Sequence, residues 1–99
     1  MPVNHLVWFK FNAGVADVRI AEHLRALASL KEAVPGVIEL SVGENFTDRA
    51  DGHTHGLTVT LADKEALGAY AAHPEHLAVV EKLRPDAQWM AMDYEFEAE

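Results

Sequence analysis

The sequence predicts an α+β protein of the ferredoxin-like class, with a β-α-β-β-α-β order of elements and an antiparallel four-stranded sheet. Three observations carry this prediction: four β-rich runs, two amphipathic helical segments between them, and a step that joins the second and third runs without a helix. Helices on only one side of such a sheet leave its other face bare. The length of the chain fits a single domain over residues 1–99.

The first strand is expected at residues 3–11, where β-branched and aromatic side chains dominate. Alternation places Leu6 and Trp8 on one face, and on the other Val3, His5, Val7, Phe9 and Phe11. Since both faces carry large apolar side chains, one needs helices and the other needs a partner. We therefore expect a homodimer, in which two subunits pair their sheets to form a dimeric α/β barrel.

The first helix is expected from Asp17, because apolar side chains recur there with a period near 3.6, and Pro35-Gly36 should end it. The second strand follows at residues 37–42. Its apolar and polar side chains alternate, which predicts one face formed by Ile38, Leu40 and Val42.

The third strand is expected at residues 55–61, with its apolar face formed by His55, Leu57, Val59 and Leu61. Asp63 should cap the next helix. Pro74 should interrupt and restart that helix, because proline is tolerated only in a first helical turn. The last strand is expected at residues 87–96.

Composition excludes several classes of function. Eight basic and sixteen acidic residues give a formal charge of −8, and the scattered basic residues form no run that follows a phosphate backbone, so no nucleic-acid partner is expected. The absence of cysteine excludes disulfides, thiolate nucleophiles and cysteine-bound metals. No signal-like start and no apolar stretch of about 20 residues occur, so we expect a cytoplasmic protein with no membrane partner.

Several segments resemble one known family. They are the opening Asn-His-Leu-Val-Trp-Phe-Lys-Phe, the Pro35-Gly36-Val37 step, the strand that begins at His55, and Ala69-Tyr70-Ala71-Ala72-His73-Pro74-Glu75-His76. Over essentially its whole length the chain is similar to the stress-responsive dimeric α/β-barrel (Dabb) proteins. That family includes plant stress-associated proteins without assigned chemistry and a polyketide cyclase that performs an aldol condensation without metal or cofactor.

The resemblance implies roles for individual residues. It implies His76 as the catalytic base, Tyr70 as the catalytic tyrosine and Asp93 as an acidic partner. It also implies that His5 and His55 are further histidines of the pocket. It does not extend to the cyclase's substrate, because the first helix lacks the tyrosine and the bulky aromatic side chains of that enzyme.

The residues themselves favour the same region. His5 and His55 are in phase with the apolar faces of their strands, so both imidazoles are expected between the sheet and the helices, near Tyr70 and His76. A neutral imidazole can accept a proton from an acidic carbon while a tyrosine hydroxyl bonds to the developing enolate. We expect an apolar pocket without a cofactor that binds a small apolar or aromatic ligand through His5, Val7, Phe9, His55 and Val59.

Structural explanations stand beside this interpretation. The histidines also fit as hydrogen-bonded core residues, and Tyr70 fits as packing on an apolar helix stripe. The protein is therefore either a cofactor-independent lyase or cyclase, or a non-catalytic stress-associated or small-molecule-binding protein.

Metal and haem binding are further alternatives. His53 with His55, and His73 with His76, have feasible ligand spacings, although His73 is expected to cap a helix, and surface carboxylates also suit a weakly held Mg or Ca ion. Stacking of Trp8 and Trp89 on a haem competes with their packing in a core or an interface.

Overall fold

The computed structural model describes residues 1–97, so residues 98 and 99 of the expected domain lie outside the described part. The elements follow in the order β1 (Val3–Phe11), α1 (Asp17–Ala33), β2 (Val37–Glu44), β3 (His55–Leu61), α2 (Lys64–Ala72), α3 (Pro74–Leu83) and β4 (Ala87–Glu95). The sheet has the order β2-β3-β1-β4, and every neighbouring pair is antiparallel. The ferredoxin-like fold is confirmed, with the second helical segment divided in two.

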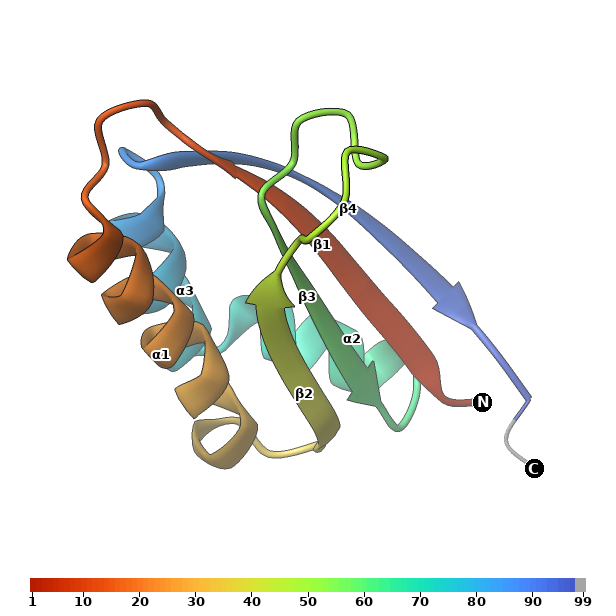
Figure 1. The fold of residues 1–99 in the computed structure, drawn as a ribbon. Helices are drawn as coiled ribbons and strands as arrows, with labels where there is room; N and C mark the ends of the chain where they lie inside the picture. The colour runs from red at the N-terminus through yellow and green to blue at the C-terminus, as the bar shows by residue number, and fades with distance from the viewer. Residues whose placement is uncertain (98–99) are drawn as a thin grey trace.

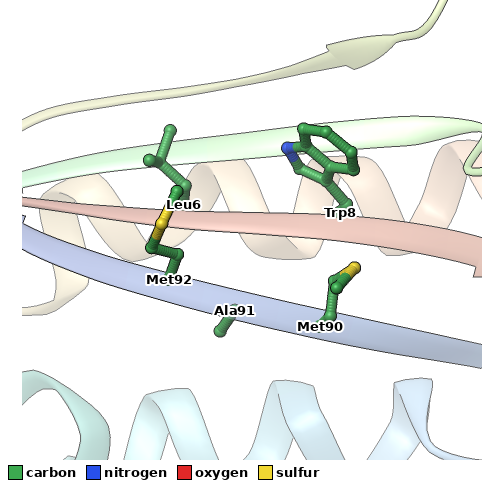
Figure 2. Close-up of a pocket in the computed structure, with 5 residues that line it drawn as sticks. All are labelled: Leu6, Trp8, Met90, Ala91 and Met92. Carbon is green, nitrogen blue, oxygen red and sulfur yellow. The ribbon is translucent and has the colours of Figure 1, made fainter. Parts of the chain in front are cut away.

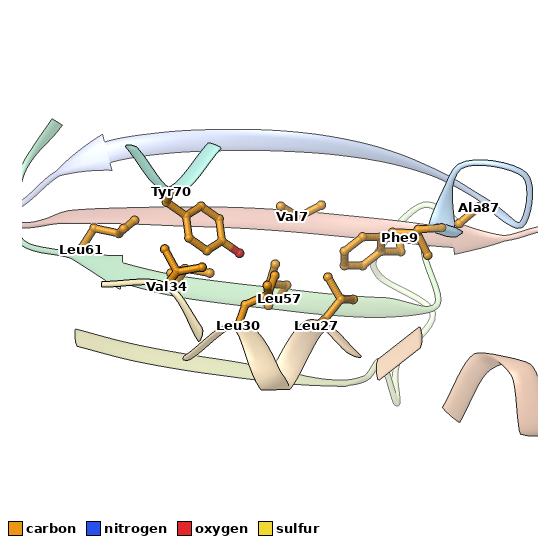
Figure 3. Packing of buried hydrophobic residues seen from close by; sticks show 11 residues of the cluster. Val7, Phe9, Leu27, Leu30, Val34, Leu57, Leu61, Tyr70 and Ala87 are labelled. Atoms are coloured by element: carbon orange, nitrogen blue, oxygen red, sulfur yellow. The ribbon is translucent and has the colours of Figure 1, made fainter. Parts of the chain in front are cut away.

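The helices α1, α2 and α3 lie on one side of the sheet, and the core fills the space between these two layers (Figure 1). Alternate residues of β1 and β3 point toward the helices and contribute the core side chains of the sheet. Every third or fourth residue of α1 contributes the core side chains of that helix. Figure 3 shows this cluster, which consists of Val7, Phe9, Leu27, Leu30, Val34, Leu57, Val59, Leu61, Tyr70, Leu83 and Ala87. Burying each large apolar side chain stabilises the fold by roughly 1.5–3 kcal/mol.

The strand β2 departs from the expected alternation at its first residues. Its register against β3 shifts between Val37 and Glu39, so that Ile38 is the extra residue of a β-bulge. Ile38 is consequently 53% exposed, whereas Leu40 and Val42 pack against the core. The prediction that Ile38 shares their face is wrong, because the bulge reverses the alternation at that point.

The expected helix boundaries are confirmed by their caps. Gly36 has a φ of +91°, a backbone conformation that residues with a Cβ atom rarely adopt, and it lies in the turn that separates α1 from β2. The side chain of Asp63 accepts from the N–H of Ala66 at the start of α2. The ring Nδ1 of His73 accepts from the N–H of Glu75 at 3.1 Å, directly before Pro74 begins α3.

None of the described helices is both long and apolar enough to cross a membrane.

Within residues 1–97, no helix covers the opposite face of the sheet (Figure 1). Four apolar side chains from β1 and β4 stand on this face around a shallow hollow, and Figure 2 shows them: Leu6, Trp8, Met90 and Met92. Trp8 is 46% exposed and Met92 is 62% exposed. We call these four residues the bare apolar patch. Its position matches the sequence expectation for Leu6 and Trp8.

Candidate functional site

A cavity of about 320 Å³ lies between the helices and the strands β3, β1 and β4. Its lining comes from α1, α3, β1, β3 and β4, and consists of His5, Val7, Phe9, Leu27, Leu57, His76, Val80, Leu83, Arg84, Trp89 and Ala91. Cavities that hold small ligands span about 300–1,000 Å³ and combine an apolar lining with few polar groups. This cavity has both properties.

His76 stands on the first turn of α3 and is held by the main chain. Because Pro74 has no N–H and the N–H of Glu75 bonds to His73, the carbonyl of Ala71 has no helical partner. The Nδ1–H of His76 donates to that carbonyl at 3.0 Å. The neutral ring therefore carries its lone pair on Nε2, which is the state of a base.

Burial lowers the pKa of His76 below its ordinary value. The hydrogen bond to the Ala71 carbonyl opposes this shift, while the neighbouring His5 and His73 lower the pKa further. His76 is therefore neutral over a wider pH range than an exposed histidine.

Tyr70 lies beside His76, with 4.6 Å between the ring centres. Its side chain is 1% exposed, and burial raises the pKa of its hydroxyl to about 12, so the group stays protonated as a donor. Among the described residues, its oxygen is the buried side-chain atom that lacks a hydrogen-bond partner. Such an unpaired group costs about 1–3 kcal/mol. The hydroxyl points into the core cluster (Figure 3), and Tyr70 is not among the residues that line the cavity.

His5 and Asp93 face each other across β1 and β4. The Nδ1–H of His5 donates to Oδ1 of Asp93 at 2.5 Å, and the rings of His5 and Tyr70 are inclined to each other at 61° with 6.0 Å between their centres. Asp93, expected as an acidic partner in the site, therefore orients His5, whereas His76 is oriented by the main chain.

His55 and Val59 lie outside the cavity lining. His55 pairs with Phe9 on β1, and Phe9 is four residues along that strand from His5. The ring of His55 is perpendicular to that of Phe11, with 5.1 Å between their centres, and it bonds to the Thr54 hydroxyl at 2.9 Å. Burial lowers the pKa of His55, and the nearby Glu44 partly offsets this effect. Val59 is fully buried opposite His5. The structure thus brings together His5, Tyr70 and His76, and places the fourth expected group, His55, elsewhere.

A second polar cluster was not expected from the sequence. His23 on α1 and Arg19 both bond to Oδ2 of Asp86, at 2.6 Å and 2.5 Å respectively. These two hydrogen bonds lower the pKa of Asp86. His23 lies four residues before Leu27 on the buried face of α1, and this spacing in the sequence could have indicated that His23 is buried. The cluster ties α1 to the turn before β4.

Two residues of the lining were also missed. The sequence pattern predicted no role for Arg84, and it predicted only packing or stacking for Trp89. Yet His76, Val80 and Arg84 are spaced four residues apart, which places them on one helix face, and Trp89 pairs with Phe9 on the neighbouring strand. The guanidinium carbon of Arg84 lies 5.8 Å from the centre of the Trp89 ring.

The histidine pairs with feasible metal spacing make other contacts. His73 caps α3, and the Nδ1–H of His53 donates to the carbonyl of Ala50 at 2.7 Å. Within residues 1–97, no group of three or more histidine or carboxylate side chains is arranged to hold a metal ion.

Fold and cavity together define a class of protein: an α+β subunit with an antiparallel sheet, helices on one face and an imidazole-containing cavity beneath them. Within this class, the chain belongs to the Stress responsive A/B Barrel Domain family, whose sequence profile it matches over residues 3–96. The family expected from the sequence is confirmed.

Three relatives place the chain further. An uncharacterised protein of Streptomyces coelicolor is 31% identical over 96 residues, which cover 95% of this chain and 99% of the relative. The olivetolic acid cyclase of Cannabis sativa is 27% identical over 79 residues, 78% of each protein. A structure from Jannaschia sp., described as a dimeric ferredoxin-like protein of unknown function, superposes with a TM-score of 0.83 at 29% identity and covers 97% of this chain and 100% of that one.

Proposed function

We propose that this protein is a cofactor-independent enzyme that removes a proton from a carbon next to a carbonyl, in an aldol, cyclase or lyase reaction. The substrate would be a small polyketide-like or aromatic molecule. One observation carries the proposal: the main chain holds the Nδ1–H of His76, which leaves Nε2 of a cavity-lining imidazole free to accept a proton.

The neighbouring groups support such chemistry. Nε2 of His76 would accept the proton, and the Tyr70 hydroxyl would donate a hydrogen bond to the enolate oxygen. Because that hydroxyl is buried and Tyr70 lies outside the cavity lining, the substrate oxygen reaches it only after a side chain moves. His5, oriented by Asp93, would stand at the same end of the cavity, and Val7 and Phe9 would hold the apolar part of the substrate.

We further propose that the functional unit is a homodimer. The bare apolar patch is the kind of surface that soluble monomers seldom expose, and a second copy offers a matching apolar surface. The structural relative from Jannaschia sp. is described as dimeric, which supports the same assembly here.

The catalytic proposal is tested without knowledge of the substrate. Proton abstraction from benzylacetone in deuterated buffer replaces the hydrogens beside its carbonyl with deuterium, which NMR follows over time. The wild-type protein should accelerate this exchange, and His76→Ala should lose roughly 100-fold or more of the acceleration while keeping its thermal unfolding midpoint. Tyr70→Phe should slow exchange less. His53→Ala, which removes a loop histidine, is the matched control.

A second function is favoured by one specific observation: Tyr70 lies outside the cavity lining. A non-catalytic stress-associated or small-molecule-binding protein needs the cavity but no accessible hydroxyl. This alternative predicts that wild-type protein binds benzylacetone without accelerating exchange, and that His76→Ala mainly lowers stability. That result would overturn the catalytic proposal.

A further inference from the structure

Arg84 brings a permanent positive charge to a largely apolar cavity. Of the described residues in the lining, it is the only lysine or arginine. Its guanidinium lies over the Trp89 ring at 5.8 Å, and an aromatic face is a favourable support for a guanidinium. Arg84 forms a long, exposed ion pair with Glu81, with 3.8 Å between Nε and Oε1, and such surface pairs contribute little free energy, so a ligand carboxylate can compete with Glu81. The side chain of Arg84 is 63% exposed, so it stands at the rim of the cavity.

The charge and the imidazoles occupy opposite ends of the cavity. Along α3, Arg84 is eight residues from His76 on the same helix face, which corresponds to about 12 Å of helix rise. Along β1, His5 is four residues from Phe9, about 13 Å of strand, and Phe9 pairs with Trp89. Apolar side chains line the space between the two ends. The cavity is therefore elongated, with imidazoles at one end and a guanidinium at the other.

We infer that the cavity binds an elongated apolar molecule that ends in a carboxylate, with the carboxylate on Arg84 and the reacting carbonyl end at His76. This inference rests on the proposed function, because it assigns a substrate class to the same cavity. A guanidinium presents a planar pair of N–H donors that matches one carboxylate. Because the lining contains a single lysine or arginine, it suits the single negative charge of a carboxylate better than the several negative charges of a polyphosphate.

The overall charge of the protein sharpens the argument. At a formal charge of −8 the molecule as a whole repels anions, so an acid gains nothing from long-range attraction. Only a local contact such as that with Arg84 can favour the acid over its neutral counterpart. With the carboxylate fixed at one end, the length of the ligand decides which of its carbons lies beside His76.

The test compares ω-phenylhexanoate with ω-phenylhexanamide, which share the apolar body and differ in charge. Binding is followed through the indole N–H signals in NMR titrations. Trp89 lies in the cavity and should shift, whereas Trp8 lies on the opposite face and should not. The signals are assigned with Trp8→Phe. In the wild-type protein the acid should bind roughly three- to tenfold more tightly than the amide, a modest gain because Arg84 is exposed.

Arg84→Gln should remove this preference while the amide still binds and shifts the Trp89 signal, which shows that the cavity is intact. Arg84→Lys should keep part of the preference. Arg25→Gln, which removes the same charge from an exposed position of α1, should keep all of it.

Two outcomes overturn the inference, and they differ in what they say of the proposed function. Equal binding of acid and amide, or a preference that survives in Arg84→Gln, refutes the carboxylate while leaving the cavity as a ligand site. Failure of both probes to shift Trp89 refutes the ligand site itself, and the proposed function with it.

Discussion

The two faces of the sheet carry comparable apolar side chains but differ in what covers them. On the face toward the helices, Phe9 of β1 is 2% exposed, and Leu30 of α1, in the same core cluster, is 1% exposed. On the other face, Trp8 is 46% exposed although it is the neighbour of Phe9 in the same strand. One alternating strand thus encodes two interactions, of which the chain completes the first alone and, in our proposal, the second only with another copy.

The largest effect is expected from breaking the bare face. Trp8→Glu would place a carboxylate between two apolar sheets, where an unpaired charge is very costly. The dimer should dissociate about 100-fold more readily or worse, as measured by sedimentation velocity over a range of concentrations. Val18→Glu, an exposed apolar position on α1, should leave the assembly unchanged. A wild-type protein that is monomeric at micromolar concentration would contradict the dimer.

An intermediate effect should separate the faces by their concentration dependence. Leu30→Ala removes a fully covered side chain and should lower the free energy of unfolding by about 2–5 kcal/mol at any protein concentration. Met92→Ala should destabilise the protein mainly through dimerisation, so its effect in urea titrations should depend on protein concentration. Equal concentration dependence for the two variants would remove the distinction between the faces.

The smallest effect concerns titration on the helix-covered face. Burial lowers the folded-state pKa of His55 and His76 below the ordinary 6.5. The unfolded chain therefore binds protons first as pH falls through 6.5, and stability should decline from there until the folded histidines also protonate. Urea titrations between about pH 7.5 and 5.5 should show this slope, which His76→Gln should reduce. NMR titration should place both midpoints below 6.5.

The fold was predictable because its signals are local. The alternation in β1, the Pro35-Gly36 stop, and the His73-Pro74 restart each depend on neighbours in sequence, and all three appear in the structure. The prediction for Ile38 was wrong because it used a local signal for a feature that is not local. A β-bulge depends on the pairing with the neighbouring strand, and the alternation within one strand carries no information about that pairing.

The candidate site was predictable only in part. Face assignment correctly placed His5 on the helix side of the sheet, but it also grouped His5 with His55, because alternation gives a residue's face and not its distance along the strand. Pairing register separates the two. The position of Arg84 in the cavity lining could not be predicted, because it depends on which face of α3 covers the cavity, and that is a tertiary feature.

The break between α2 and α3 bears on how this site can evolve. The acceptor that fixes the protonated nitrogen of His76 is the carbonyl of Ala71, which exists in every amino acid and cannot be lost by substitution there. Replacing neighbouring side chains can therefore reshape the cavity for a new ligand while the choice of basic nitrogen is inherited unchanged. A mutation that lets the helix continue through residues 73 and 74 would direct the N–H of Glu75 to that carbonyl and so erase this choice.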